Sequence, residues 1–147
     1  MLAPLLLASM AIAINMIVQV SAVVVMLTVL KRRLERGLIR PDFRHNSTIL
    51  IIVLFVLFGG HLFQIAVWAI LFLQLDQFND FATAFYHSTV NFSTLGYGDI
   101  VMDERWRLLG ALQAAGGVLM FGLSTGTLFA VMSFLLQHHR GEAKTAP

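Results

Sequence analysis

Three long apolar runs dominate the sequence, at residues 1–30, 48–75 and 108–136. Each is long enough to cross the hydrocarbon core of a bilayer as a helix, at about 1.5 Å per residue. Because 58% of the residues are hydrophobic and only 12% are charged, the chain cannot hide its apolar side chains in one water-soluble core. The sequence therefore predicts an all-α integral membrane protein with three transmembrane helices.

The first run could also be interpreted as a cleaved signal peptide. Signal peptides carry positive charge before their apolar segment, whereas here Lys31, Arg32 and Arg33 follow it. We therefore predict a retained N-terminal transmembrane helix over residues 1–30.

Residues 31–47 form a basic connector that holds six of the ten basic residues: Lys31, Arg32, Arg33, Arg36, Arg40 and Arg44. The positive-inside rule predicts that this connector is a cytoplasmic loop. The N-terminus would then lie outside, and the polar tail at 137–147, which we expect to be loosely ordered, would lie in the cytoplasm. Residues 31–44 could also contact anionic lipid headgroups. A voltage sensor is disfavoured, because sensors place their arginines within a membrane-crossing helix.

Residues 76–107 carry five acidic and two basic side chains, which suits an outer surface that attracts cations. Within them lies a short apolar run at 81–93 that is too short to span. Asn79 or Asp80 can cap its start. We predict a re-entrant helix, whose carboxyl end would point inward and favour a cation there. Tyr86 and His87 would pack behind the segment that follows.

That segment, residues 94–99, reads Thr-Leu-Gly-Tyr-Gly-Asp. A file of backbone carbonyls can replace the water shell of a cation only if successive carbonyls point the same way, whereas an ordinary strand alternates them. Turning alternate residues around requires backbone angles that are open to glycine, which explains Gly96 and Gly98. Thr94 adds a hydroxyl at the inner end, and Asp99 places a carboxylate at the outer mouth.

Residues 94–99 resemble the selectivity filter of the potassium channel family, and the resemblance extends over 48–136. It implies an outer helix at 48–75, a pore helix at 81–93, a filter at 94–99 and an inner helix at 106–136, as in small prokaryotic-type subunits, with residues 1–30 as an additional helix. Dehydrated K⁺ would be bound by the backbone carbonyls of Thr94, Leu95, Gly96 and Tyr97. The chain holds one filter and no internal repeat, while the family surrounds its pore with four filter loops, so we expect a homotetramer.

The resemblance further implies passive K⁺ conduction in the cell membrane, with no covalent chemistry, no enzymatic activity and no nucleic acid as partner. Two departures from the family pattern concern the scaffold behind the filter. Leu95 stands where Val is common, and we expect its side chain to pack behind the filter. Val90 stands where some members carry an acid that braces the residue equivalent to Asp99, so Asp99 would need another partner.

The inner helix carries a stripe of residues four apart: Gly117, Phe121, Thr125 and Phe129. We predict that this stripe lines the pore, with Phe121 or Phe129 as a hydrophobic constriction. By resemblance Gly117 is a hinge. Close helix packing without bending explains the same glycine equally well.

Polar residues deep in the first two spans also need partners. Asn15 and Gln19 share one helix face, and His61, Gln64 and Trp68 share another. We predict that these two faces pair, which would attach the additional helix to the pore unit. A pH-sensing role for His61 is an alternative.

Two other functions fit parts of the sequence. A membrane subunit of a potassium uptake transporter is disfavoured by the intact single motif, because the filter loops of such transporters are degenerate and repeated within one chain. A non-conducting, regulatory channel subunit stays open as an alternative.

Overall fold

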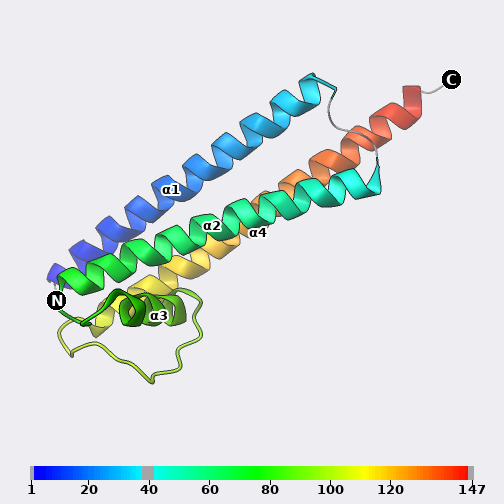
Figure 1. Cartoon of the computed structure of the whole chain (residues 1–147). Coiled ribbons are helices and arrows are strands. Elements are labelled where there is room, and N and C mark those ends of the chain that lie inside the picture. Colours follow the sequence, from blue (N-terminus) through cyan, green and yellow to red (C-terminus); the bar gives the residue numbers. More distant parts are fainter. Residues whose placement is uncertain (1, 38–41, 146–147) are drawn as a thin grey trace.

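The computed structural model describes residues 2–37 and 42–145, and these residues form four helices and no strand (Figure 1). The helices are α1 (Leu2–Glu35), α2 (Phe43–Gln74), α3 (Phe81–Phe92) and α4 (Arg107–Thr145). Three of them, α1, α2 and α4, are long and apolar enough to cross a membrane. The predicted all-α membrane fold is therefore confirmed.

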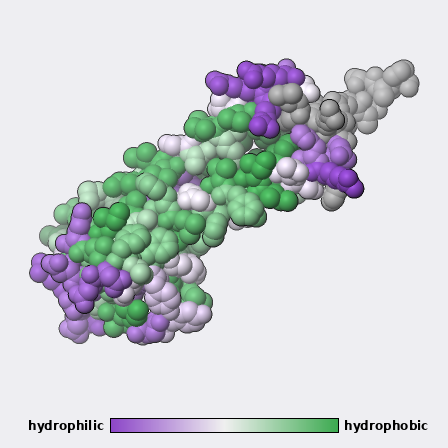
Figure 2. Space-filling model, viewed as in Figure 1, coloured by the Kyte–Doolittle hydropathy of each residue, from purple (hydrophilic) through white to green (hydrophobic). Residues whose placement is uncertain are grey.

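The three long helices form a rod, and α3 lies at one end of it against α2 and α4 (Figure 1). The N-terminus lies at the same end as α3. The end of α1, the start of α2 and the carboxyl end of α4 lie at the opposite end. Hydrophilic residues gather at both ends, with a hydrophobic band between them (Figure 2). This band is the surface that a bilayer would cover.

Both predicted polar segments are more helical than expected. α1 continues through Glu35, where Lys31 and Glu35 form an i,i+4 pair at 3.9 Å. It ends there, two residues before Gly37, whose φ is +64°. α2 begins after its N-cap Asp42, so helices cover both ends of the predicted loop at 31–47; Arg40 lies outside the described residues. The predicted tail at 137–147 is helical through Thr145, since Glu142, Ala143 and Lys144 are strong helix formers.

A buried polar layer divides the interior of the rod into two apolar clusters. The cluster near α3 includes Ala8, Trp68, Phe72, Leu109 and Met120. The cluster near the basic end includes Leu30, Ile49, Val53, Val131 and Leu135. The residues of this layer are Gln19 on α1, His61 and Gln64 on α2, and Ser124 on α4. Each falls between the two clusters along its helix, so the layer crosses the rod at one level.

The polar layer joins α1 to both helices of the pore unit. The Gln19 side chain accepts a hydrogen bond from Gln64 of α2 at 2.8 Å and donates one to Ser124 of α4 at 2.8 Å. Ser124 Oγ also lies 2.9 Å from His61 Nε2. The predicted pairing is thus confirmed for Gln19 and Gln64. Asn15 is buried, but its side-chain oxygen has no hydrogen-bond partner among the described residues. The predicted pairing is therefore wrong for Asn15.

Candidate functional site

The short helix α3 is fixed at its start by a cap. Asp80 accepts hydrogen bonds from the Thr83 backbone N–H at 2.9 Å and from the Thr83 hydroxyl at 2.7 Å. The Thr83 backbone N–H is the main reason that the pKa of Asp80 lies below its usual value. Of the two predicted caps, the structure selects Asp80. The charged carboxylate also suits the positive end of the helix dipole.

The middle of α3 is held between α2 and α4 by a buried serine. Ser88 Oγ donates to the Ile65 carbonyl of α2 at 2.8 Å and accepts from Gln113 Nε2 of α4 at 2.6 Å. Neither Ser88 nor Gln113 stands out in the sequence interpretation above. Gln113 could have been found, because a lone amide in an apolar spanning run requires a buried partner.

The carboxyl end of α3 meets α4 at a glycine. A Cβ built on Gly117 would overlap the carbonyl oxygen of Phe92, the last residue of α3. The Phe92 side chain is fully buried and contacts the rings of His61 and Phe121, with centroids 5.8 Å and 5.5 Å away. Gly117 therefore allows α4 to touch the end of α3 directly, which makes it a packing glycine. Its role as a hinge stays a prediction.

The chain leaves α3 through a tight turn into residues 94–99. The carbonyl of Val90 accepts from the backbone N–H groups of Leu95, at 3.0 Å, and Gly96, at 3.3 Å. Positive φ angles then occur at every second residue, with +62° at Thr94, +61° at Gly96 and +72° at Gly98. The glycine conformations were predicted and are confirmed. The left-handed conformation of Thr94 was not predicted. In a residue with a side chain this conformation is energetically unfavourable, so it occurs only where the surrounding structure imposes it.

The end of this loop at Asp99 is held by α3. Asp99 accepts a hydrogen bond from the Tyr86 hydroxyl at 2.7 Å, which lowers the pKa of Asp99 and raises that of Tyr86. His87 Nδ1 lies 3.0 Å from the Ile100 carbonyl, and His87 Nε2 lies 2.8 Å from the Asn91 amide nitrogen. A carbonyl only accepts, so Nδ1 carries the proton and Nε2 accepts from Asn91. Tyr86 and His87 thus pack behind the loop as predicted, and Tyr86 is the partner that Asp99 lacks at Val90.

A second contact joins the turn before α3 to the segment that follows the loop. The side-chain oxygen of Gln77, in the turn before α3, accepts from the Asp103 backbone N–H at 3.0 Å, while its nitrogen donates to the Leu75 carbonyl at 2.9 Å. Both ends of the segment between α2 and α4 are therefore tied together.

The remaining predicted residues differ in their surroundings. Leu95 is 55% exposed on the single chain, so its expected packing behind the filter is not formed with described residues of its own chain. Phe121 contacts His61, with ring centroids 4.8 Å apart. Thr125 and Phe129 are exposed on α4. That Gly117, Phe121, Thr125 and Phe129 line a pore stays a prediction.

The comparison with protein families identifies the same part of the chain. A model of the ion channel family matches residues 48–134, which include nearly all of α2, all of α3, the loop at 94–99 and most of α4. No match is found among curated proteins or among solved structures. Since the match covers more than half of the chain and its three helices have the expected arrangement, the chain belongs to the ion channel family, as a pore-loop member that carries α1 in addition.

Proposed function

We propose that the protein is a potassium-selective channel that conducts K⁺ passively through a homotetrameric pore. The observation that carries this proposal is the alternation of positive φ angles at Thr94, Gly96 and Gly98 within the sequence Thr-Leu-Gly-Tyr-Gly-Asp. This alternation is what a file of carbonyls needs if they are to face one side. The C-terminus of α3 ends beside this loop, and its partial negative charge favours a cation.

In this proposal the backbone carbonyls of Thr94, Leu95, Gly96 and Tyr97, with the Thr94 hydroxyl, replace the water shell of the transported K⁺. Each chain supplies one such loop, so four copies are needed to surround an ion. In this proposal the end of the rod that carries the acidic segment 76–107 faces outward with the N-terminus, and the basic end faces the cytoplasm of a cell membrane. The exposed position of Leu95 on the single chain is compatible with packing against a neighbouring copy.

The test is ion flux into liposomes that contain the purified full-length protein. We expect K⁺ flux to exceed Na⁺ flux and Ba²⁺ to block it. Absence of flux under every gradient would refute conduction and favour a regulatory subunit. Flux that requires energy input or a coupled ion would favour a transporter subunit.

The filter assignment is tested by Gly96→Ala against the matched control Gly59→Ala. A Cβ at either position has no neighbour within 4 Å on the single chain, but only Gly96 has a positive φ. We expect Gly96→Ala to abolish K⁺ selectivity or conduction and Gly59→Ala to conduct normally. A fully selective Gly96→Ala channel would refute the role of residues 94–99.

A further inference from the structure

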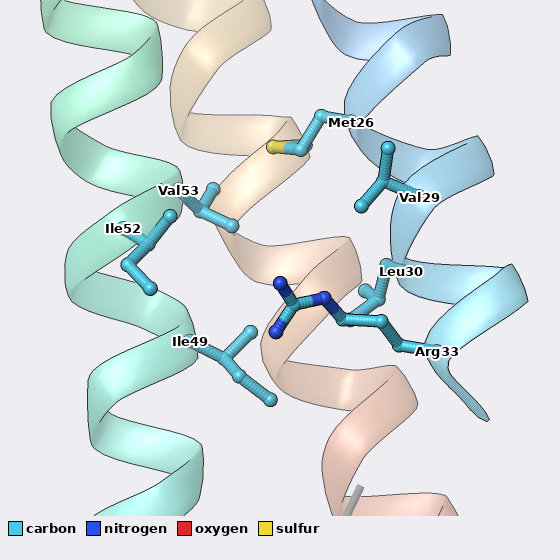
Figure 3. Close-up of a pocket in the computed structure, with 7 residues that line it drawn as sticks. All are labelled: Met26, Val29, Leu30, Arg33, Ile49, Ile52 and Val53. Atoms are coloured by element: carbon cyan, nitrogen blue, oxygen red, sulfur yellow. The ribbon is translucent and has the colours of Figure 1, made fainter. Parts of the chain in front are cut away.

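The two halves of α1 pack differently against the pore unit. In the first half, Ala8, Ala11, Asn15 and Gln19 are buried, whereas beyond Gln19 only Leu30 is buried among the described residues of α1. The looser half leaves a groove of about 110 Å³ between α1 and α2 at the basic end (Figure 3). Its walls are apolar and consist of Met26, Val29 and Leu30 from α1 and Ile49, Ile52 and Val53 from α2.

One charged side chain, that of Arg33, also lines this groove. It extends from α1 across the groove, with its guanidinium group directed towards the side of α2 that carries Ile49 (Figure 3). Arg33 and Val29 also line a second hollow of about 480 Å³, whose other walls are Arg32 and Arg36. The apolar groove therefore adjoins a cluster of three arginines and shares Val29 and Arg33 with it.

This arginine cluster has no acidic partner in the part of the chain that the structure describes. The ion pairs there are Lys31–Glu35 and Arg107–Glu104, so the nearby carboxylate of Glu35 is directed to Lys31. Three uncompensated guanidinium groups at the end of a spanning helix favour an anion, and phosphate oxygens match the fork of an arginine.

We propose that this groove and the arginine cluster together bind one anionic phospholipid. Its phosphate would contact Arg32, Arg33 and Arg36, and one acyl chain would lie between α1 and α2 against Val29, Ile49 and Val53. A soluble anion would use only the arginines, and a neutral lipid only the groove; the adjacency of the two favours a ligand with both parts. The bound lipid fills the gap where α1 separates from α2 and ties α1 to the pore unit at the basic end. The proposal does not depend on K⁺ conduction.

The experiment is native mass spectrometry of the full-length assembly in detergent, titrated with phosphatidylglycerol or with phosphatidylcholine. We expect saturable binding of phosphatidylglycerol and much weaker binding of phosphatidylcholine. Arg33→Gln should weaken phosphatidylglycerol binding about fivefold, the usual effect of one arginine at a membrane surface. The matched control is Arg44→Gln, which removes the same charge at the same end but lines neither hollow. It should bind like the wild type.

A second pair of variants tests the acyl chain with all charges kept. Val29→Trp fills the groove, while Val25→Trp places the same side chain one turn earlier, outside it; both positions are exposed, at 46% and 63%. We expect only Val29→Trp to lose phosphatidylglycerol binding.

Three results would overturn the proposal. Equal losses in Arg33→Gln and Arg44→Gln would mean that the charge acts diffusely. Unchanged binding in Val29→Trp would exclude the acyl chain from the groove. Absence of lipid binding together with a lower assembly mass in Val29→Trp would show that a neighbouring copy covers this surface.

Discussion

The contact between Gly117 and the end of α3 makes a direct prediction for Gly117→Ala. The added Cβ would overlap the Phe92 carbonyl oxygen and lie 3.0 Å from the carbonyl carbon. Both obstructing atoms belong to the backbone, so no side-chain rotation relieves the overlap, and either α3 or α4 must shift.

The magnitude follows from this rigidity. Overpacking a well-packed interior costs about 1–3 kcal/mol, and because the neighbour here is backbone we expect about 3 kcal/mol of lost unfolding free energy. The better helix propensity of alanine offsets up to about 1 kcal/mol of that loss. Two glycines nearby on α4 provide comparison positions at which an added Cβ is less obstructed. A Cβ at Gly116 would lie 3.2 Å from Cγ1 of Ile12, a side chain that can move, and a Cβ at Gly122 has nothing within 4 Å.

The assay is unfolding of the full-length protein in mixed micelles by titration with sodium dodecyl sulfate, followed by circular dichroism. We expect Gly117→Ala to be the least stable, Gly116→Ala intermediate and Gly122→Ala close to the wild type. Under the proposed function, K⁺ over Na⁺ flux in liposomes should fall in Gly117→Ala, because Phe92 lies just before the proposed filter at 94–99. If Gly117→Ala is as stable as Gly122→Ala and changes only channel opening, the packing argument fails and the hinge explains the glycine.

Two further predictions concern polar contacts. Gln19→Leu removes hydrogen bonds to both Gln64 and Ser124; at about 0.6–1.7 kcal/mol for each such bond in a membrane, we expect a loss of about 1–3 kcal/mol in the same titration. A double-mutant cycle with Gln64→Leu should show coupling, and strict additivity would contradict the pairing. Tyr86→Phe removes the hydroxyl that is the main cause of the lowered pKa of Asp99. A lowered carboxyl pKa stabilises the fold above the unfolded value of about 4 and loses that effect as pH falls through the folded value. The wild type should therefore exceed Tyr86→Phe in stability at neutral pH, and the two should converge in strong acid; a difference that is the same at every pH would exclude the Asp99 charge as its source.

The spanning helices were predictable because their signal is compositional. A run such as 48–75 cannot remain in water, whatever it contacts. The helix ends were less predictable, since the polar side chains in 31–47 are compatible with both a loop and a helix. The exposed pair of Lys31 with Glu35 adds only a few tenths of a kcal/mol to the helix at the end of α1. Positive φ angles at Gly96 and Gly98 were also predictable, because glycine is the residue that adopts them most easily.

What the sequence could not supply were contacts between distant elements. Asp99 and Tyr86 are 13 residues apart, and only the path of the loop back over α3 brings them together. A hinge and close packing both predict a glycine at position 117, so the sequence alone could not separate the two explanations. The position of the Phe92 carbonyl was needed to show close packing. Ser124 also lacked a signal, because a single serine among the small residues of the inner helix does not reveal its partners, although its hydroxyl completes the polar layer.

These contacts also constrain how α1 could affect the filter. Within the described residues the backbone of α1 packs beside α2 and α4, and α3 packs beside the same two helices, so the backbone contacts that connect α1 to α3 run through α2 and α4. Gln19 contacts Ser124, Ser124 contacts His61, and the His61 ring lies against Phe92 at the end of α3. Spatial succession alone does not establish coupling. A double-mutant cycle between Gln19→Leu and Phe92→Leu, read out as K⁺ over Na⁺ flux, decides the matter: non-additive effects on selectivity would mean that α1 supports the filter through this layer, and additive effects would limit α1 to assembly and lipid contact.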